Sequence, residues 1–367
     1  MVEKVKISHR QLTILFLLIT IGDSILILPS IPANEAHQDA WISGILSLLL
    51  GLVICYLYYA VGKLYPQLTL IEYTNVIFGK IGWFISLLFI IYPLLSLAAL
   101  LREIGDFMAT QIFVETPMEA IIILMLLVVI MAVRLGLECI ARSAEIFFPF
   151  LILLFIVMVV CLLPQIKLDN VYPVLEHGIH PILRGSISFT ALPFMETFVI
   201  LMILPYVNKK AGIKRSLLIG GGIGGTVLLI MTGLSLLVLD PNLTAKSVYP
   251  SYKLASKINL ADMIQRVEAV LAAIWFITIF FKMALYLYAA SLGTAQLLKL
   301  NNYQFLLLPF GMITIPLALT LGENSMYLSY IFMKIWPFYD LTHAVIFPTL
   351  LLIIGTYKKK MEAKLSL

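Results

Sequence analysis

Charged side chains are scarce in this sequence, and a few of them interrupt long runs of apolar residues. Asp23, Glu196 and Lys282 each lie inside such a run. A carboxylate or an ammonium group among apolar residues is costly unless it is paired, and such groups commonly bind an ion, a proton or a ligand. These three residues are therefore candidates for ligand binding and proton coupling, and Asp23 is the natural partner of Lys282.

A fourth charged group, Arg102-Glu103-x-x-Asp106, lies near the end of another apolar run. Its position within one turn of the predicted membrane interface favours a structural ion cluster over a ligand site. Glu196 follows Pro193 by one helical turn and faces a cavity if the helix is broken there. Lys282 can snorkel or pair with a carboxylate, and we favour an interior role in which its ammonium takes the place of a bound cation.

The composition restricts the chain to one class of protein. Of its 367 residues 61% are hydrophobic and 12% are charged, whereas soluble domains carry about twice that share of charge. This excludes a cytosolic enzyme, a nucleic-acid-binding protein and a disordered chain. The sequence predicts an integral membrane protein.

Ten apolar runs are long enough to cross a bilayer, which takes about 20 residues per helix. They are continuous rather than alternating, so they predict helices and not barrel strands. The chain is thus an all-α membrane protein with one membrane domain over 1–367, in which helices 1–5 occupy about 11–163, helices 6–10 about 183–356 and a cytoplasmic tail 357–367. The runs are 11–32, 40–60, 83–105, 119–137, 143–163, 183–206, 216–238, 267–290, 303–321 and 336–356.

Lys and Arg are distributed unevenly between the two sides. With the N-terminus inside, sixteen of the 25 fall on the inner side, seven on the outer side, and Arg102 and Lys282 within spans. Because cytoplasmic loops are enriched in these residues, both termini are predicted to be cytoplasmic. A cleaved signal peptide is the alternative. We disfavour it because the run 12–32 is long, contains Asp23, and its removal leaves nine spans.

The first span of each half carries a matching interruption. Ile21-Gly22-Asp23-Ser24 interrupts span 1, and Thr190-Ala191-Leu192-Pro193-Phe194 interrupts span 6. Gly releases the backbone from the helix and Pro removes a hydrogen bond. Transporters with inverted five-plus-five repeats bind their ligand at such breaks. The alternative is that these residues only kink the helices.

Aromatic residues near the breaks are expected to wall the pocket, although each taken singly more often belongs to the core or faces lipid. The predicted ligand-binding residues are Ile21, Gly22, Asp23, Ser24, Tyr92, Phe189, Thr190, Ala191, Pro193, Phe194, Glu196, Lys282 and Tyr286.

Other patterns indicate packing or loops rather than chemistry. Gly220–Gly225 contains two GxxxG spacings, which favour close helix packing. His177-x-x-His180 lacks a third ligand, the three cysteines form no CxxC pair, and known catalytic motifs are absent, so we expect no metal, no cofactor and no enzyme activity. The outer loop near 239–266 is long enough for a short helix and can act as a lid. The segment 61–82 is predicted to lie at the membrane interface on the inner side.

Several of these segments together resemble one family. They are Ile-Ser-x-x-Gln-Leu at 7–12, the break at 21–24 with Leu26 and Pro29, Gln38–Trp41, Leu101–Phe107, Val133–Glu138, Ala141–Glu145 and Leu192–Glu196. The chain resembles the B subunits of spore germinant receptors, a family within the amino acid–polyamine–organocation superfamily. The resemblance covers essentially the whole chain.

The resemblance implies a leucine-transporter-like fold in the inner membrane of the spore. It also implies a receptor that binds a small nutrient, often an amino acid, together with an A-type membrane subunit and a C-type lipoprotein subunit. Asp23 departs from the small residues that amino acid transporters of the superfamily carry at the first break. Either Lys282 neutralises Asp23, or Asp23 meets the ligand's amine, or the nutrient is not a plain amino acid.

Three hypotheses for function follow. The first is a nutrient sensor that triggers germination, the second is a proton-coupled amino acid transporter, and the third is a pore-forming or scaffolding subunit without a ligand.

Overall fold

The computed structural model describes residues 6–208, 210–258, 268–322, 327 and 330–365. Three basic residues counted in the charge asymmetry, Lys4, Lys209 and Arg266, lie outside them, as does the last part (259–266) of the predicted outer loop. The described chain is helical, apart from connecting loops and an isolated bridge between Ile7 and Val207.

Eight helical stretches of the described chain are long and apolar enough to cross a membrane: His9–Ile27, Ser30–Leu64, Lys80–Ile112, Leu137–Gln165, Ile179–Met202, Lys210–Leu239, Glu268–Leu297 and Ile331–Met361. Two shorter apolar helices, α7 (Met118–Arg134) and Gln304–Thr320, occupy the remaining positions predicted for spans. The protein is therefore a multi-pass membrane protein with the predicted helical fold.

The first five-helix half contains α1 (His9–Ile21), α2 (Ser24–Ile27), α3 (Ser30–Ala36), η1 (His37–Asp39), α4 (Ala40–Leu64), α5 (Leu70–Phe78), α6 (Lys80–Phe107), η2 (Met108–Ile112), α7, α8 (Leu137–Leu162), η3 (Leu163–Gln165) and η4 (Leu168–Val171). The segments α1, α2 and α3 together form the predicted first span and its continuation, which we call helix 1.

The second half contains α9 (Ile179–Thr190), η5 (Ala191–Met195), η6 (Glu196–Met202), η7 (Leu204–Tyr206), η8 (Lys210–Gly212), α10 (Ile213–Leu239), α11 (Pro241–Lys246), α12 (Pro250–Ala255), α13 (Glu268–Leu297), η9 (Gln304–Leu306), α14 (Leu307–Thr320), η10 (Ile331–Ile335), α16 (Trp336–Leu341), η11 (Thr342–Ile346) and α17 (Phe347–Leu365). The segments α9, η5 and η6 form the sixth helix, which we call helix 6.

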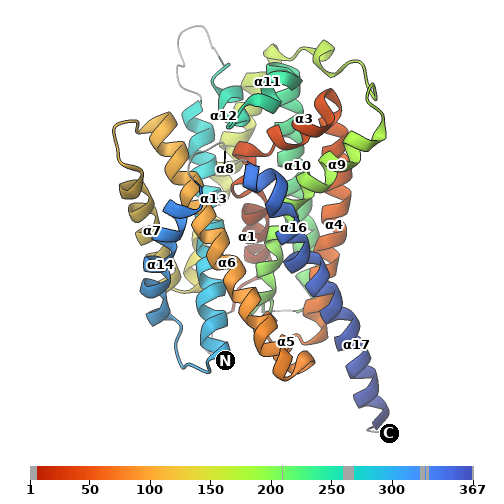
Figure 1. Cartoon of the computed structure of the whole chain (residues 1–367), viewed down its shortest axis with the longest axis vertical. Coiled ribbons are helices and arrows are strands. Elements are labelled where there is room, and N and C mark those ends of the chain that lie inside the picture. Colours follow the sequence, from red (N-terminus) through yellow and green to blue (C-terminus); the bar gives the residue numbers. More distant parts are fainter. Residues whose placement is uncertain (1–5, 209, 259–267, 323–326, 328–329, 366–367) are drawn as a thin grey trace.

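Both termini lie at the same end of the molecule, which we call the termini end (Figure 1). The short helices α11 and α12 lie at the opposite end, in the loop where a short helix is predicted.

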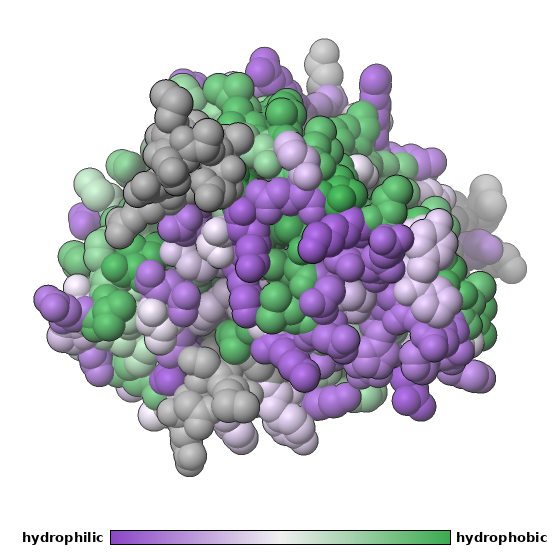
Figure 2. All heavy atoms as spheres, turned by 90° about the horizontal axis from the view of Figure 1, so that it is seen from above, coloured by the Kyte–Doolittle hydropathy of each residue, from purple (hydrophilic) through white to green (hydrophobic). Residues whose placement is uncertain are grey.

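Figure 2 shows that opposite end, where hydrophilic side chains gather over the face and hydrophobic ones lie around much of it. Large apolar side chains such as Val53, Leu124 and Phe150 are 60–66% exposed. A surface of this kind suits a lipid environment.

Helix 1 begins and breaks where its sequence dictates. Ser8 and Gln11 form a reciprocal capping box, in which Ser8 Oγ accepts from the Gln11 amide and the Gln11 side chain accepts from the Ser8 amide. Such a box satisfies amides that the first turn leaves without partners. The helix ends at Gly22, whose φ of +36° favours glycine. The predicted interruption of span 1 is thus present.

The glycines of α10 allow close packing against α1 and α4, as predicted. A Cβ added at Gly220 meets the backbone oxygen of Thr13 at 2.7 Å, and one added at Gly224 meets Thr20 at 2.9 Å. These contacts are too short to be tolerated without movement. Gly220 and Gly224 therefore set the distance between α1 and α10.

We predict that Gly220→Ala lowers the free energy of unfolding by about 1–3 kcal/mol, because the methyl group is forced against backbone. Thermal unfolding of the detergent-solubilised protein measures this. Gly233→Ala is the matched control on the same helix: a Cβ there meets nothing within 4 Å, and alanine favours a helix by about 1 kcal/mol over glycine. Equal melting temperatures of the two variants contradict the packing argument.

Candidate functional site

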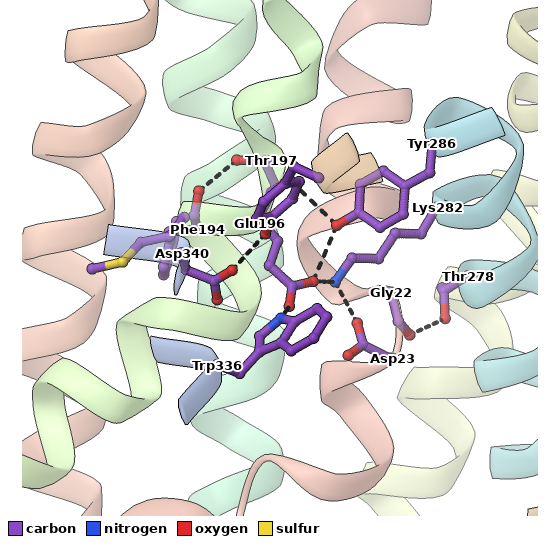
Figure 3. A network of polar contacts seen from close by, with 12 residues as sticks. Gly22, Asp23, Phe194, Glu196, Thr197, Thr278, Lys282, Tyr286, Trp336 and Asp340 are labelled. Carbon is purple, nitrogen blue, oxygen red and sulfur yellow. Dashed lines mark hydrogen bonds and ion pairs between the residues drawn. The ribbon is translucent and has the colours of Figure 1, made fainter. Parts of the chain in front are cut away.

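A buried lysine joins the two helix breaks. The Lys282 ammonium, on α13, forms ion pairs with Asp23 Oδ1 and, at 2.5 Å, with Glu196 Oε2 (Figure 3). Their side chains are 1–4% exposed. Asp23 lies between α1 and α2, and Glu196 begins η6. One cation therefore holds helix 1, helix 6 and α13 together, as the sequence predicts for Lys282 and Asp23.

The backbone of the first break is also tied to α13. Thr278 Oγ1 donates to the Gly22 carbonyl oxygen at 2.8 Å. A Cβ at Gly22 lies 2.6 Å from Lys282 Cδ, so glycine is needed both for its φ and to let the lysine stem pass. Gly22 thus allows Lys282 to reach Asp23.

Glu196 has a full set of hydrogen-bond donors around it. Trp336 Nε1, from α16, donates to Oε1 at 2.7 Å, and Tyr286 Oη donates to Oε2 at 3.1 Å. With the Lys282 ammonium these groups come from two helices beside helix 6. Such charge-assisted bonds stabilise the ionised carboxylate. Asp23, Glu196, Lys282, Tyr286 and Trp336 form what we call the Lys282 cluster. Glu196 makes the most polar contacts within it.

The break of helix 6 frees carbonyl groups that other side chains then satisfy. Helix 6 passes from the α-helix α9 through the π-helical turn η5 into the 3₁₀ helix η6. Tyr58 Oη donates to the carbonyl oxygens of Phe194 at 3.3 Å and Met195 at 3.0 Å, and Thr197 Oγ1 donates to that of Phe194 at 2.7 Å. The second predicted interruption is therefore present, with Pro193 inside it.

Another buried carboxylate lies beside the cluster. Tyr92 Oη donates to Asp340 Oδ1 at 2.5 Å, and Asp340 is fully buried on α16. The Tyr92 ring stacks on Tyr339, with centroids 5.0 Å apart, and lies 5.0 Å from the His343 ring. Tyr92, a predicted pocket residue, thus links α6 to the last span.

Several predicted site residues face other helices. The Phe194 ring fits against Gly51 of α4 and Gly225 of α10, where an added Cβ lies 2.4 Å and 2.6 Å from ring atoms. Phe189 packs against Gly44 of α4, and Thr190 Oγ1 bonds with Ser47 Oγ at 3.0 Å. Their role in ligand binding stays a prediction.

The remaining predicted residues are all buried around the breaks. Ile21 lines an apolar cavity of about 210 Å³ together with residues of α1, α8, α10 and α13. Ala191 and Pro193 are buried in η5. Ser24, in α2, is 0% exposed.

Three buried polar groups near the first break have no hydrogen-bond partner among the described residues: Ser24 Oγ, Trp275 Nε1 and both carboxylate oxygens of Glu103. They belong to α2, α13 and α6, and α13 packs against both α6 and α1. Buried polar atoms are nearly always bonded, so each such group calls for an explanation. A small polar ligand can supply the missing partners.

An aromatic layer lies next to these groups, toward the end opposite the termini. The Phe107 ring makes edge contacts with Tyr249 and Tyr252, both at 5.1 Å, and with Trp275 at 4.8 Å. Tyr249 and Tyr252 come from the start of α12 and from α12 itself, which contacts α2, α10 and α13. The loop in which a lid is predicted therefore covers this side of the cluster.

The prediction for the Arg102–Asp106 segment is right for two residues and wrong for one. Arg102 Nε pairs with Asp106 Oδ1 at 3.3 Å, and Arg102 Nη1 donates to the Leu319 carbonyl oxygen. Glu103 takes no part in this ion pair. Residues i and i+4 share a helix face, whereas i+1 points elsewhere, so Glu103 does not belong to this ion cluster.

Sequence reasoning missed Trp336, Asp340 and Thr278. Asp340 is an acidic residue inside the apolar run 336–356, and the criterion that selected Asp23 and Glu196 applies to it equally. Trp336 and Thr278 carry no comparable signal, because a tryptophan or threonine in a span is ordinary. Among the described residues, no group of three or more His, Cys, Asp or Glu is arranged to hold a metal ion.

Comparison with known proteins identifies the family of this chain. The model of a family described as "spore germination protein" matches residues 6–326. The chain belongs to this family. It is 32% identical to spore germination protein KB of Bacillus subtilis (strain 168), over 99% of this chain and 98% of that protein.

Solved structures with a similar fold are membrane transporters. Mhp1, a nucleobase-cation-symport-1 family transporter in a closed conformation with bromovinylhydantoin bound, aligns with a TM-score of 0.69 and 10% identity, over 89% of this chain and 75% of its own. MhsT in complex with L-phenylalanine aligns with a TM-score of 0.66 and 15% identity, over 96% and 99%. These likenesses confirm the leucine-transporter-like fold with broken helices 1 and 6.

We predict that Lys282→Met lowers the free energy of unfolding by about 3–5 kcal/mol, because it leaves two buried carboxylates without their cation. Asp23→Asn is less damaging, since the Lys282–Glu196 pair remains. Thermal unfolding in detergent compares these variants. Lys334→Met is the control, because Lys334 pairs with Glu35 at the surface and is 58% exposed, where a pair contributes at most about 1 kcal/mol. A Lys282→Met protein as stable as the control variant contradicts the assignment.

Proposed function

We propose that this chain is the nutrient-sensing membrane subunit of a spore germinant receptor. It binds a small germinant, an amino acid or a molecule of similar size, beside the Lys282 cluster and thereby triggers germination. Family membership supports the physiological role. The observation that carries the binding proposal is the set of unpartnered buried polar groups, Ser24 Oγ, Trp275 Nε1 and the Glu103 carboxylate, next to the break of helix 1.

The chemistry of this set suits a molecule with an amine and a carboxylate. Glu103 can accept hydrogen bonds from an ammonium group, and the Ser24 hydroxyl and the Trp275 indole can donate to a carboxylate. Asp23 is paired with Lys282, which it shares with Glu196, so the ammonium offsets part of the negative charge that repels an anionic group. Of the three alternatives for Asp23, this arrangement supports neutralisation by Lys282. The fold shared with MhsT, whose structure contains L-phenylalanine, supports a ligand of this size.

The chain is proposed to lie in the inner spore membrane with both termini in the cytoplasm. The excess of Lys and Arg in the segments at the termini end supports this orientation. The proposed partners are an A-type membrane subunit and a C-type lipoprotein subunit, as the family resemblance implies. We further propose that residues 1–367 act as one membrane domain.

We predict that Ser24→Ala and Glu103→Gln each raise the nutrient concentration for half-maximal germination by roughly 10-fold or more, because each removes a bond to a charged ligand group. Germination of spores that carry each variant measures this. Glu35→Gln, at the surface pair with Lys334, is the control for loss of a carboxylate. Unchanged dose–response curves for both site variants contradict the pocket assignment.

An active proton-coupled transporter is the second candidate, favoured by the transporter fold and by the buried acids Asp23, Glu196 and Asp340. We predict for the sensor that proteoliposomes bind labelled nutrient without accumulating it against a gradient. Uptake that is driven by a proton gradient and lost in Glu196→Gln contradicts the sensor and supports the transporter.

A further inference from the structure

The termini end of the molecule carries lysines without acidic partners. Lys63 lies in the last turn of α4, Lys210 begins η8 and Lys214 lies in the first turn of α10. Among the described residues no carboxylate oxygen forms an ion pair with any of the three, whereas Arg142, also predicted on the inner side, pairs with Glu138. Around these three lysines the termini end therefore carries positive charge that no described carboxylate pairs with.

A cavity opens beside two of these lysines, Lys63 and Lys210. It has a volume of about 280 Å³ and is lined by Tyr59, Gly62, Lys63, Leu204, Lys210 and Ile213, among others. Lys210 Nζ donates to the carbonyl oxygens of Leu204 at 2.8 Å and Pro205 at 2.6 Å. An ammonium group has three donors, so one donor of Lys210 remains for a bound group.

The outer face of α4 leads from the lipid-exposed surface to this cavity. Leu49, Val53 and Tyr56 follow one another at helical spacing and are 50–66% exposed. The Lys214 ammonium lies 5.0 Å from the centre of the Tyr56 ring, and the Tyr56 and Tyr59 rings are 6.1 Å apart. Tyrosines and lysines at the end of an apolar helix face are typical of the depth of lipid headgroups.

We propose that this cavity binds the headgroup phosphate of an anionic phospholipid, with an acyl chain along the Leu49–Val53–Tyr56 face of α4. Basic pockets between membrane helices bind such headgroups. The apolar face of α4 favours a lipid over a soluble phosphate, because a soluble anion has no acyl chain that can pack against this face. Because Lys210 also donates to carbonyl oxygens of η7, the turn that follows helix 6, the bound lipid contacts the continuation of the broken helix that carries Glu196.

The test measures lipid binding to the purified full chain by native mass spectrometry. Phosphatidylglycerol is compared with phosphatidylcholine for the natural sequence, for Lys63→Gln/Lys214→Gln and for Lys253→Gln/Lys257→Gln. The last variant removes two lysines at the opposite end and is the matched control. Lys210 is kept because it bonds to backbone, and equal thermal unfolding of the variants in detergent shows that they are folded.

We expect preferential binding of phosphatidylglycerol and a dissociation constant on the order of 30-fold higher in Lys63→Gln/Lys214→Gln, at about fivefold per lysine. The control variant stays within about twofold of the natural sequence. Equal binding of the two lipids, or an equal loss in both variants, overturns the proposal. Displacement of the lipid by equimolar glycerol 3-phosphate overturns the lipid assignment and indicates a site for soluble phosphate.

Discussion

The ammonium group of Lys282 is the interaction on which the site depends. It lies between Asp23 and Glu196, and these residues belong to the two helices whose main chains are broken. Removing three charges from water is expensive, and a buried ion pair contributes less to stability than its Coulomb energy suggests. The role of the Lys282 ion pairs here is to fix the relative positions of the helices. Because moving either helix away from Lys282 leaves a buried carboxylate without its cation, the breaks of helices 1 and 6 are held at one place beside α13.

Around this point the site is asymmetric in its hydrogen bonding. Glu196 is saturated by Lys282, Tyr286 and Trp336, whereas Ser24, Glu103 and Trp275 have unpartnered polar atoms within the described chain. The Glu196 side connects helix 6 with the last span, where Oδ2 of Asp340 is also unpartnered within the described chain, and the other side lies beneath α12. A ligand that bonds to the unsatisfied side contacts α2, α6 and α13 together. It stabilises whichever conformation brings these helices close, and this is how a transporter fold can act as a sensor.

The sequence could predict the features that depend on residue type alone. The spans follow from apolar run length, the breaks from Gly22 and Pro193, and the Lys282–Asp23 pair from the cost of charge in a membrane. Side-chain directions could not be predicted in the same way. One residue along a helix turns a side chain by about 100°, which separates Glu103 from Arg102 and Asp106. The π-helical turn η5 again changes the direction in which the following side chains leave the helix axis. Phe194 consequently fits against α4 and α10. Trp336 reaches Glu196 only through the packing of the last span, which no local pattern specifies.

A nutrient is proposed to bind next to the break of helix 1, which Lys282 joins to the break of helix 6. Hydrogen–deuterium exchange of the receptor in lipid nanodiscs, with and without its nutrient, tests this most directly. We predict slower exchange of the backbone amides in 18–28, which the nutrient contacts, and in 189–200, which the Lys282–Glu196 ion pair joins to the first break, with little change in the exposed segment 168–178. Unchanged exchange in both break segments at a saturating nutrient concentration, with protection elsewhere in the chain, contradicts it.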